Sequence, residues 1–293
     1  MYDTVRDRLI HLHHCRGAGW KTIQALLAAD ATLSAPFSLS PSALRSLVPL
    51  SDAQWNAFFH DLHAIDMQRL LQAYHSRGIH LITLWDADYP PLLKHIHAPP
   101  WVLYAKGNLA LLQQVKLISI VGTRHPTKEG IAALEKLVPP LVSAGFTIVS
   151  GLAFGIDVCA HQLAVRHGGT TIAVIAGGLD HVYPKAHRSF ARQLMEEHLV
   201  IAEHPPATRP QPWQFPARNR IISGLSLGTI VVQARVKSGS LITAAYALEQ
   251  GREVFAVPGP IGLAESAGPN TLIQHGAKLV QQADDVIAEF PYL

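Results

Sequence analysis

The stretch LISIVGTRHPTKEGIAALEKLVPPLVSAGFTIVSG, residues 117–151, decides the fold of this chain. Apolar runs open and close it, at 117–121 and 146–149, and residues 127–145 between them carry apolar side chains at helical spacing. The two runs are nearly continuous in Leu, Ile, Val and Phe, without the regular polar alternation of a half-exposed strand. Such strands are covered on both faces, so the stretch predicts a strand–helix–strand unit of a parallel sheet.

The same alternation of strands and helices extends over the rest of the chain. Further strands are predicted at 78–86, 101–105, 170–176, 199–202, 228–234 and 253–257, and helices at 156–168, 187–198, 217–226 and 241–251. We therefore expect an α/β fold with a mostly parallel, doubly wound sheet.

Residues 1–77 differ from this pattern and predict only helices. Ser-Pro at 40–41 and Ser-Asp at 51–52 are typical helix starts. The turn GAG at 17–19 resembles a helix–hairpin–helix, a motif whose backbone N–H groups bind nucleic-acid phosphates. A plain packing or protein-contact module explains the same pattern equally well. We expect a small helical domain over residues 1–77 and an α/β domain over residues 78–293.

The composition favours an ordinary folded protein of the cytoplasm. Of 293 residues, 48% are apolar and 15% are charged, and the net charge is +3. No apolar run is long enough to span a membrane, and charges occupy the N-terminus where a signal peptide needs apolar residues. Two cysteines, Cys15 and Cys159, cannot supply a disulfide framework. Adjacent helical residues point about 100° apart, so the cluster HLHHC at 11–15 predicts no metal site, and no cofactor is expected.

Glycine, hydroxyl or basic residues follow nearly every predicted strand. In an open parallel sheet these positions meet at the carboxyl edge, where ligands bind. Glycine lets backbone N–H groups approach an oxyanion, and hydroxyl groups and helix N-termini add further donors. The residues at this edge include Gly122, Thr123, Arg124, Ser150, Gly151, Lys237, Ser238, Gly239 and Ser240. Together they predict an edge that binds phosphates.

The distribution of charge favours a polyanion as the ligand. No Asp or Glu occurs between Glu203 and Glu249, whereas five cationic residues do: Arg209, Arg218, Arg220, Arg235 and Lys237. A solvated basic face would show the same charges. Trp213 and Phe215 precede Arg218 and are placed to stack on exposed bases. Single-stranded nucleic acid fits this combination, whereas a duplex reader would need a recognition helix.

Signatures of nucleotide enzymes are missing or misplaced. The chain has neither a P-loop nor a GxGxxG fingerprint after its first strand. GLSLG at 224–228 matches a nucleophile elbow around Ser226, but a predicted helix precedes it and a strand follows it, which reverses the elbow. Asp157 and His161, four residues apart at a helix start, indicate capping rather than a catalytic dyad. We therefore expect binding without catalysis.

Six blocks, in order, resemble the signature motifs of the DNA-processing protein A (DprA/Smf) family. They are SIVGTRHPTKEG, VSGLAFGID, GGLDHVYP, FPARNRIISGLS, KSGSLITAAYALEQGREVFAVPG and GPNTLIQHGA. The resemblance extends from about Gly78 to Asp285. The N-terminal helices resemble the family's sterile-alpha-motif-like domain less sharply. No winged-helix domain of the kind that ends many members is expected, because the chain stops at Leu293.

The resemblance implies an extended Rossmann-like domain that binds single-stranded DNA and forms a homodimer. It further implies a role in natural transformation, or competence: protecting incoming single strands and loading the RecA recombinase onto them. By resemblance, the strand-binding pocket contains Arg124, Ser150, Gly151, Arg218, Asn219, Arg220, Lys237, Ser238, Gly239 and Ser240, to which Phe215 is added for stacking.

Two positions depart from the family pattern. Gln233 stands where the family usually has glutamate, which leaves the pairing of a pocket arginine open. His187 stands where asparagine is usual.

Two other functions remain open at this point. One is a nucleotide or nucleoside-phosphate hydrolase on a related sheet, with Asp157, Asp180 or Glu203 as its acid or base. The other assigns partner binding to the N-terminal helices and leaves the sheet as a scaffold. The favoured hypothesis requires the cationic residues to share one rim of the sheet, free of internal carboxylates.

Overall fold

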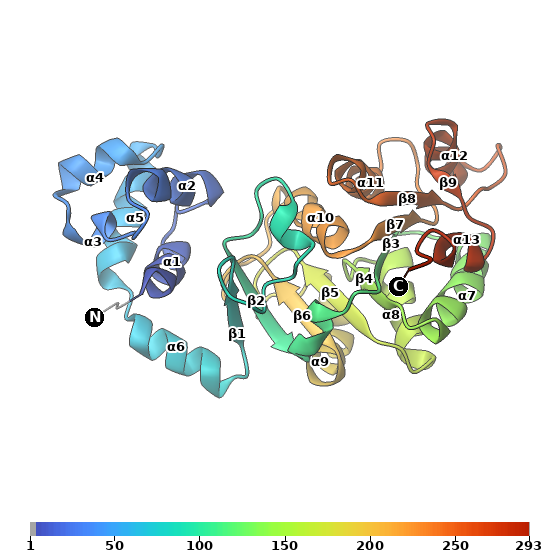
Figure 1. Ribbon diagram of the computed structural model, residues 1–293, viewed down its shortest axis with the longest axis horizontal. Helices are drawn as coiled ribbons and strands as arrows, with labels where there is room; N and C mark the ends of the chain where they lie inside the picture. Colours follow the sequence, from blue (N-terminus) through green and yellow to red (C-terminus); the bar gives the residue numbers. More distant parts are fainter. Residues whose placement is uncertain (1–3, 293) are drawn as a thin grey trace. The chain divides into compact units, whose positions relative to one another are not determined.

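The computed structural model describes residues 4–292 and confirms the α/β fold (Figure 1). Contacts divide the chain into two units. One comprises the chain up to Ala87 together with Pro100–Leu103, and the other comprises Asp88–Pro99 and the chain from Tyr104 onward. This division by contacts does not test where separately folding domains begin and end. The domain boundary expected between residues 77 and 78 therefore stays a prediction.

The first unit is built mainly from helices, as predicted from its sequence. They are α1 (Val5–His14), α2 (Trp20–Ala29), α3 (Ala35–Ser38), α4 (Pro41–Leu47), α5 (Asp52–Ala64) and α6 (Met67–Ser76), and strand β1 (His80–Thr83) follows. Ser40 and Ser51 are the N-caps of α4 and α5, and Ser51 forms a capping box with Gln54. Leu9, Leu26 and Phe58 are fully buried, so the apolar faces of α1, α2 and α5 form the core of this unit.

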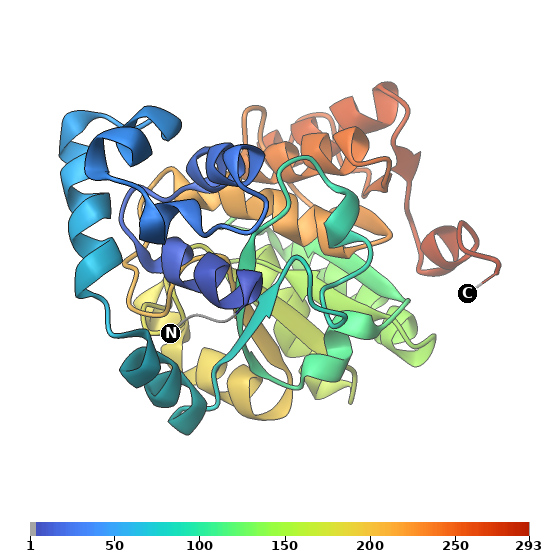
Figure 2. The same ribbon diagram turned by 60° about the vertical axis from the view of Figure 1, so that its left-hand side comes forward.

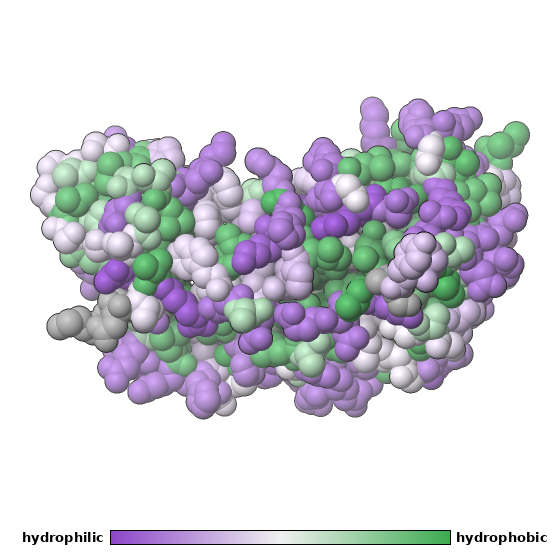
Figure 3. Space-filling view, in the orientation of Figure 1, coloured by the Kyte–Doolittle hydropathy of each residue, from purple (hydrophilic) through white to green (hydrophobic). Residues whose placement is uncertain are grey.

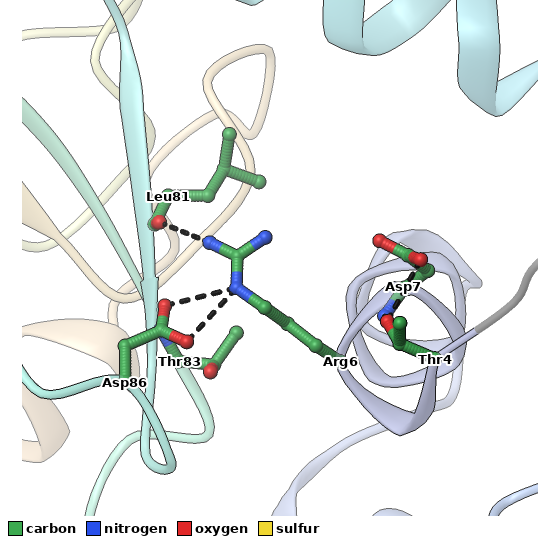
Figure 4. A network of polar contacts seen from close by, with 6 residues as sticks. All are labelled: Thr4, Arg6, Asp7, Leu81, Thr83 and Asp86. Carbon is green, nitrogen blue, oxygen red and sulfur yellow. Dashed lines mark hydrogen bonds and ion pairs between the residues drawn. The ribbon is translucent and has the colours of Figure 1, made fainter.

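Arg6 ties α1 to β1 and to the turn that follows this strand (Figure 4). Its Nη2 donates to the carbonyl of Leu81 at 2.9 Å, and its Nε donates to a carboxylate oxygen of Asp86 at 2.9 Å. The other carboxylate oxygen accepts the backbone N–H of Thr83 at 2.9 Å. The arginine therefore links the first helix to a segment much later in the chain.

A second ion pair in this unit, between Arg16 and Asp61, predicts a dependence of stability on acid pH. Arg16 donates to both carboxylate oxygens of Asp61 at 2.7 Å, and these hydrogen bonds lower the pKa of Asp61 to about 2. A carboxyl whose pKa is depressed stabilises the fold above its unfolded value, near 4, and this contribution is lost as pH falls through the folded value.

Asp61→Asn should lower the free energy of unfolding by about 2 kcal/mol at pH 7, because charged hydrogen bonds are lost. Denaturant unfolding of both proteins at pH 7, 4 and 3 measures the difference, which should shrink from pH 4 downward. A difference that stays constant with pH would contradict the role of the ionised carboxyl.

The strands of the described residues form one sheet in the order β1-β2-β6-β5-β4-β3-β7-β8-β9. After β1 they are β2 (Val102–Gly107), β3 (Leu117–Val121), β4 (Thr147–Ser150), β5 (Thr171–Ile175), β6 (Leu199–Ala202), β7 (Gly228–Val231), β8 (Glu253–Ala256) and β9 (Lys278–Leu279). Neighbouring strands from β6 to β9 are parallel, whereas β2 pairs antiparallel with β6. The predicted parallel sheet is confirmed, with this antiparallel strand added to it.

Helices cover both faces of the sheet of the second unit (Figures 1 and 2). On one face lie α7 (Lys128–Ser143), α8 (Ile156–Arg166) and α9 (Arg188–Glu197), and on the other lie α10 (Gln214–Leu225) and α11 (Gly239–Glu249). The segments α12 (Ala267–Gln274) and α13 (Asp284–Ile287) follow β8 and β9. Ile118, Ile148 and Phe255 of the strands pack with Leu137 of α7 in one apolar core. The sheet is doubly wound, as predicted.

The order of the strands creates a switch point between β3 and β7. From β3 the chain continues to β4, β5 and β6 on one side, and it then returns through α10 to β7 on the other side of β3. In open parallel sheets, the crevice beyond the carboxyl ends of two such strands is where ligands bind. The topology therefore indicates that a ligand site lies beyond the carboxyl ends of β3 and β7.

The surface shown in Figure 3 mixes apolar residues with polar and charged ones. Large apolar side chains that are exposed in the second unit include Val236, Ile242, Leu248 and Ile261. Among the residues that the structure describes, no helix combines the length and the apolar character needed to cross a membrane.

Candidate nucleic-acid interface

A pocket of about 980 Å³ opens at the carboxyl ends of β3 and β7. The loop after β3 contributes Gly122, Thr123 and Arg124, and the loop after β7 contributes residues 235–240. Helix α10 closes another side with Phe215, Arg218 and Asn219. The pocket therefore lies at the switch point of the sheet.

Most of the side chains predicted for the site line this pocket. They are Arg124, Phe215, Arg218, Asn219, Lys237, Ser238, Gly239 and Ser240. Gly151 lines a smaller, adjoining pocket together with Phe154, Tyr183 and Arg218. Ser150 and Arg220 line neither of the two pockets.

Arg124 and Lys237 are the cations of the pocket that are exposed and without an internal counter-charge. Both are exposed, and neither forms an ion pair within residues 4–292. Lys237 adopts a left-handed backbone conformation with φ 66°, which is uncommon for a residue other than glycine. Directly after it, Ser238 is the N-cap of α11, whose helix dipole adds positive potential at this end. The pocket thus offers two free cations and one helix N-terminus to an anion.

Arg235 also lines the pocket but is neutralised by a carboxylate. Its Nη2 and Nε donate to Glu265 Oε1 at 2.6 and 2.8 Å, and Arg235 itself remains exposed. These hydrogen bonds lower the pKa of Glu265, so the pair is ionised at neutral pH. Glu265 lies outside the acid-free segment of the sequence, and only the fold brings it to the pocket. With it and Asp157, the pocket has four cationic side chains and two carboxylates.

The position of Ser150 corrects a prediction. Its side chain is fully buried at the end of β4, and its Oγ donates to the carbonyl of Ile120 on the neighbouring strand at 2.6 Å. A hydroxyl used between two strands cannot donate to a ligand in the pocket. Ser150 therefore supports the sheet at this edge.

The position of Arg220 corrects a second prediction. Its Nη2 donates to Glu203 Oε1 at 2.5 Å, and both side chains are largely buried. Residues two apart on a helix point in nearly opposite directions, so Arg218 and Arg220 cannot face the same pocket. The helix predicted over 217–226 already implied this separation. The favoured hypothesis excluded internal carboxylates, but Glu203 neutralises Arg220 here and Glu265 neutralises Arg235 in the pocket. For these two cations that part of the hypothesis is wrong.

Arg220→Gln should destabilise the fold without changing the ionic contacts of a bound polyanion. Loss of the pair leaves Glu203 largely buried and uncompensated, which costs about 2 kcal/mol of unfolding free energy. Denaturant unfolding measures this cost, and the salt dependence of single-stranded DNA binding should keep its slope. A shallower slope would show that Arg220 does contact phosphates.

Aromatic side chains flank the cations. Phe215 packs edge-on against Tyr183 with ring centroids 5.6 Å apart, and both line the pocket. Trp213, just before α10, is 63% exposed and packs edge-on against His204. Exposed aromatic faces beside cations are typical of surfaces that bind single strands. Tyr183 belongs to the block GGLDHVYP, which marked it as part of a family motif but not as a residue of the pocket.

Gln233 and His187, the two departures from the family pattern, both hold backbone in place. The Oε1 of Gln233 accepts the backbone N–H of Thr127 at 3.0 Å, and its Nε2 donates to the Thr127 hydroxyl at 2.8 Å. Gln233 thus fixes the start of α7, whereas the family pattern suggested that this position orients an arginine of the pocket. His187 Nδ1 lies 2.9 Å from the carbonyl of Leu152.

The residues considered for hydrolysis are buried, paired with another side chain or outside the pocket. Burial raises the pKa of Asp157, which lines the pocket, while Arg218 and nearby backbone N–H groups oppose this shift. Glu203 is paired with Arg220, and Asp180 does not line the pocket. Ser226 is buried after α10 and before β7, so the reversed order of the elbow is confirmed. His161 is buried beside Thr171, with 2.6 Å between Nδ1 and the hydroxyl.

The chain is similar to known proteins over most of its length. A family model described as DNA recombination-mediator protein A matches residues 80–291. The DNA processing protein DprA of Bacillus subtilis is 50% identical over 225 residues, which cover 77% of this chain and 76% of the relative. The corresponding protein of Streptococcus pneumoniae is 47% identical over 210 residues, covering 72% and 74%.

Solved structures of such proteins have the same fold. DNA processing protein A of Streptococcus pneumoniae superposes with a TM-score of 0.84 at 37% identity, covering 100% of both chains. A structure of the Helicobacter pylori protein, described for its single-stranded DNA binding mode, superposes with a TM-score of 0.65 at 30% identity. It covers 72% of this chain and 95% of the other.

Proposed function

Because the chain belongs to the DNA recombination-mediator protein A family, we propose that it binds single-stranded DNA through the pocket at the carboxyl edge of its sheet. The observation that carries this proposal is the pair of exposed, unpaired cations, Arg124 and Lys237, on two loops of one pocket. Cations on separate loops suit successive phosphates of one strand better than a single nucleotide. Phe215 and Tyr183 beside them supply stacking surfaces for bases.

The relatives support the same ligand. The Helicobacter pylori protein, 30% identical, binds single-stranded DNA according to its structural description. The family's description as a recombination mediator supports a role in DNA recombination. We propose that this role belongs to natural transformation, where the protein protects incoming strands and helps to load the RecA recombinase. A homodimer through the α/β unit, a cytoplasmic location and the absence of catalysis belong to the same proposal.

Binding measured against salt tests the proposal. Fluorescence anisotropy with labelled single-stranded and duplex DNA of equal length, at several salt concentrations, gives both affinities. The single strand should bind more tightly, and its log–log salt slope should be about −0.7 for each phosphate neutralised. Two free cations and the helix N-terminus thus predict a slope of roughly −1.5 to −2. Equal affinity for the duplex, or strong dependence on base identity, would contradict the proposal.

A further inference from the structure

Arg218 lies at the floor of the pocket, where it joins the ends of two adjacent strands. More than nine-tenths of this residue is buried. Its Nη1 donates to the carbonyl of Gly151, which follows β4, at 2.6 Å, and also to the carbonyl of Val174 in β5. One nitrogen thus bridges two neighbouring strands at the edge where the pocket forms.

Gly151 and Arg218 fit each other closely. A Cβ on residue 151 would lie 2.2 Å from Nη1 of Arg218 and 2.6 Å from its Cζ and Nη2. These three atoms are the nearest neighbours of that Cβ, and all belong to the same guanidinium. The backbone of Gly151 does not adopt a positive φ. Glycine is therefore required here by the arginine rather than by the conformation of the chain.

Arg218 differs from Arg124 and Lys237 in the surroundings of its charge. Burial lowers the pKa of Arg218 to about 10, which leaves the guanidinium charged at neutral pH, and the carboxylate of Asp157 favours that charge. Asp157 is itself buried and lines the same pocket. Arg124 and Lys237, by contrast, are exposed and have no carboxylate partner within residues 4–292.

We propose that Arg218 is a positioning residue of the DNA site: it holds the ends of β4 and β5 together and neutralises no phosphate itself. The positioning role rests on the proposed function, because it concerns the DNA site. The close contact between Gly151 and Arg218, which we call the link, does not depend on that function. Gly151, Ala176 and Gly177 at these strand ends line the smaller pocket. Loss of the bridge lets the two strand ends separate and distorts the walls beside Arg124.

A double-mutant cycle between Gly151→Ala and Arg218→Gln tests the link by thermal unfolding, without DNA. Gly151→Ala alone should lower Tm by about 4 °C or more, since a collision with a buried side chain strains the fold. In the Arg218→Gln background the colliding atoms are gone, so the same change should shift Tm by only about 1 °C. If Gly151→Ala shifted Tm equally in the two backgrounds, Gly151 and Arg218 would not be coupled and the link would be contradicted.

The salt dependence of single-stranded DNA binding tests the positioning role. Arg218→Gln should weaken binding about tenfold while the slope stays at the wild-type value. Lys237→Gln, the matched control for a direct contact, should make the slope shallower by about 0.7. A slope reduced equally by Arg218→Gln would overturn the inference and leave the proposed function standing. If the wild-type protein did not prefer the single strand, the proposed function would be contradicted instead. The unfolding cycle would still show whether Gly151 and Arg218 are coupled.

Arg218→Lys provides a second variant if Arg218→Gln does not fold. Lysine keeps the charge but lacks the planar guanidinium that reaches both carbonyls. A positioning residue predicts that affinity falls nearly as far as in Arg218→Gln, at an unchanged slope. Affinity within about twofold of wild type would show that the charge alone matters and would overturn the inference.

Discussion

Replacing Arg124 and Lys237 together by glutamine is expected to weaken single-stranded DNA binding about 100-fold, because each charged hydrogen bond contributes about a factor of ten. Both side chains are exposed on loops that line the pocket, and neither has a carboxylate partner within residues 4–292. The log–log salt slope should become shallower by about 1.4, since two phosphate contacts of a single strand are lost. Anisotropy titrations between low and physiological salt measure both quantities.

The single variants and a charge-matched control sharpen this experiment. Each single change should cost about tenfold, and the effects should add because the two residues stand on separate loops. Arg235→Gln should have a smaller effect, since Glu265 already neutralises that arginine. The control combines Lys136→Gln and Arg166→Gln, which remove two exposed cations outside both pockets. If this control weakened binding as much as the double variant, net charge rather than the pocket would explain the affinity.

The sequence predicted the sheet well because the signal for buried parallel strands is local. The runs at 117–121, 146–149 and 228–234 consist mostly of apolar residues, and each coincides with or overlaps a strand that is buried on both faces. Glycine and hydroxyl residues after these runs correctly predicted which edge forms the pocket. The antiparallel pairing of β2 with β6 was not predicted, because pairing partners far apart in the chain leave no periodic signal.

The roles of the arginines depended on partners that the sequence does not place. The segment between Glu203 and Glu249 contains no acid, yet Glu203 reaches Arg220 and Glu265 reaches Arg235. Carboxylates from outside the acid-free segment therefore neutralise two of its five cations, and one of them, Glu265, lies well beyond the end of the segment in the chain. Arg218 was predicted at the pocket and lies there, but its two hydrogen bonds to backbone carbonyls appear only when β4 and β5 are adjacent. Charge patterns in a sequence thus predict a site more securely than the role of each cation in it.

Gly155→Ala is expected to lower the free energy of unfolding by about 3 kcal/mol, because it combines an unfavourable backbone conformation with a collision against backbone atoms. Gly155 precedes α8 and has φ 77°. A Cβ there would lie 2.3 Å from the carbonyl oxygen of Thr123 and 2.7 Å from the carbonyl carbon of Arg124. Backbone atoms cannot rotate aside as a flexible side chain can, so the loop after β3 must move.

The same substitution should therefore weaken DNA binding as well as stability. The Thr123 carbonyl accepts the backbone N–H of Ile156 at 3.1 Å, which joins the loop of Arg124 to the start of α8. A shift of this loop displaces Arg124 from the pocket, and we expect about a tenfold loss of affinity for single-stranded DNA with a shallower salt slope. Denaturant unfolding and anisotropy titrations on the same preparation measure the two effects.

Gly168→Ala is the control for a positive φ. Gly168 has φ 71°, close to that of Gly155, but no atom lies within 4 Å of the Cβ that alanine would add. It should cost only about 1 kcal/mol and leave DNA binding unchanged, since the positive φ is the sole penalty. The difference between the two variants then measures the contact of Gly155 with the Arg124 loop together with the cost of its ψ of −125°. Equal losses of stability, with DNA binding intact in both variants, would mean that this contact does not hold the loop in its binding position.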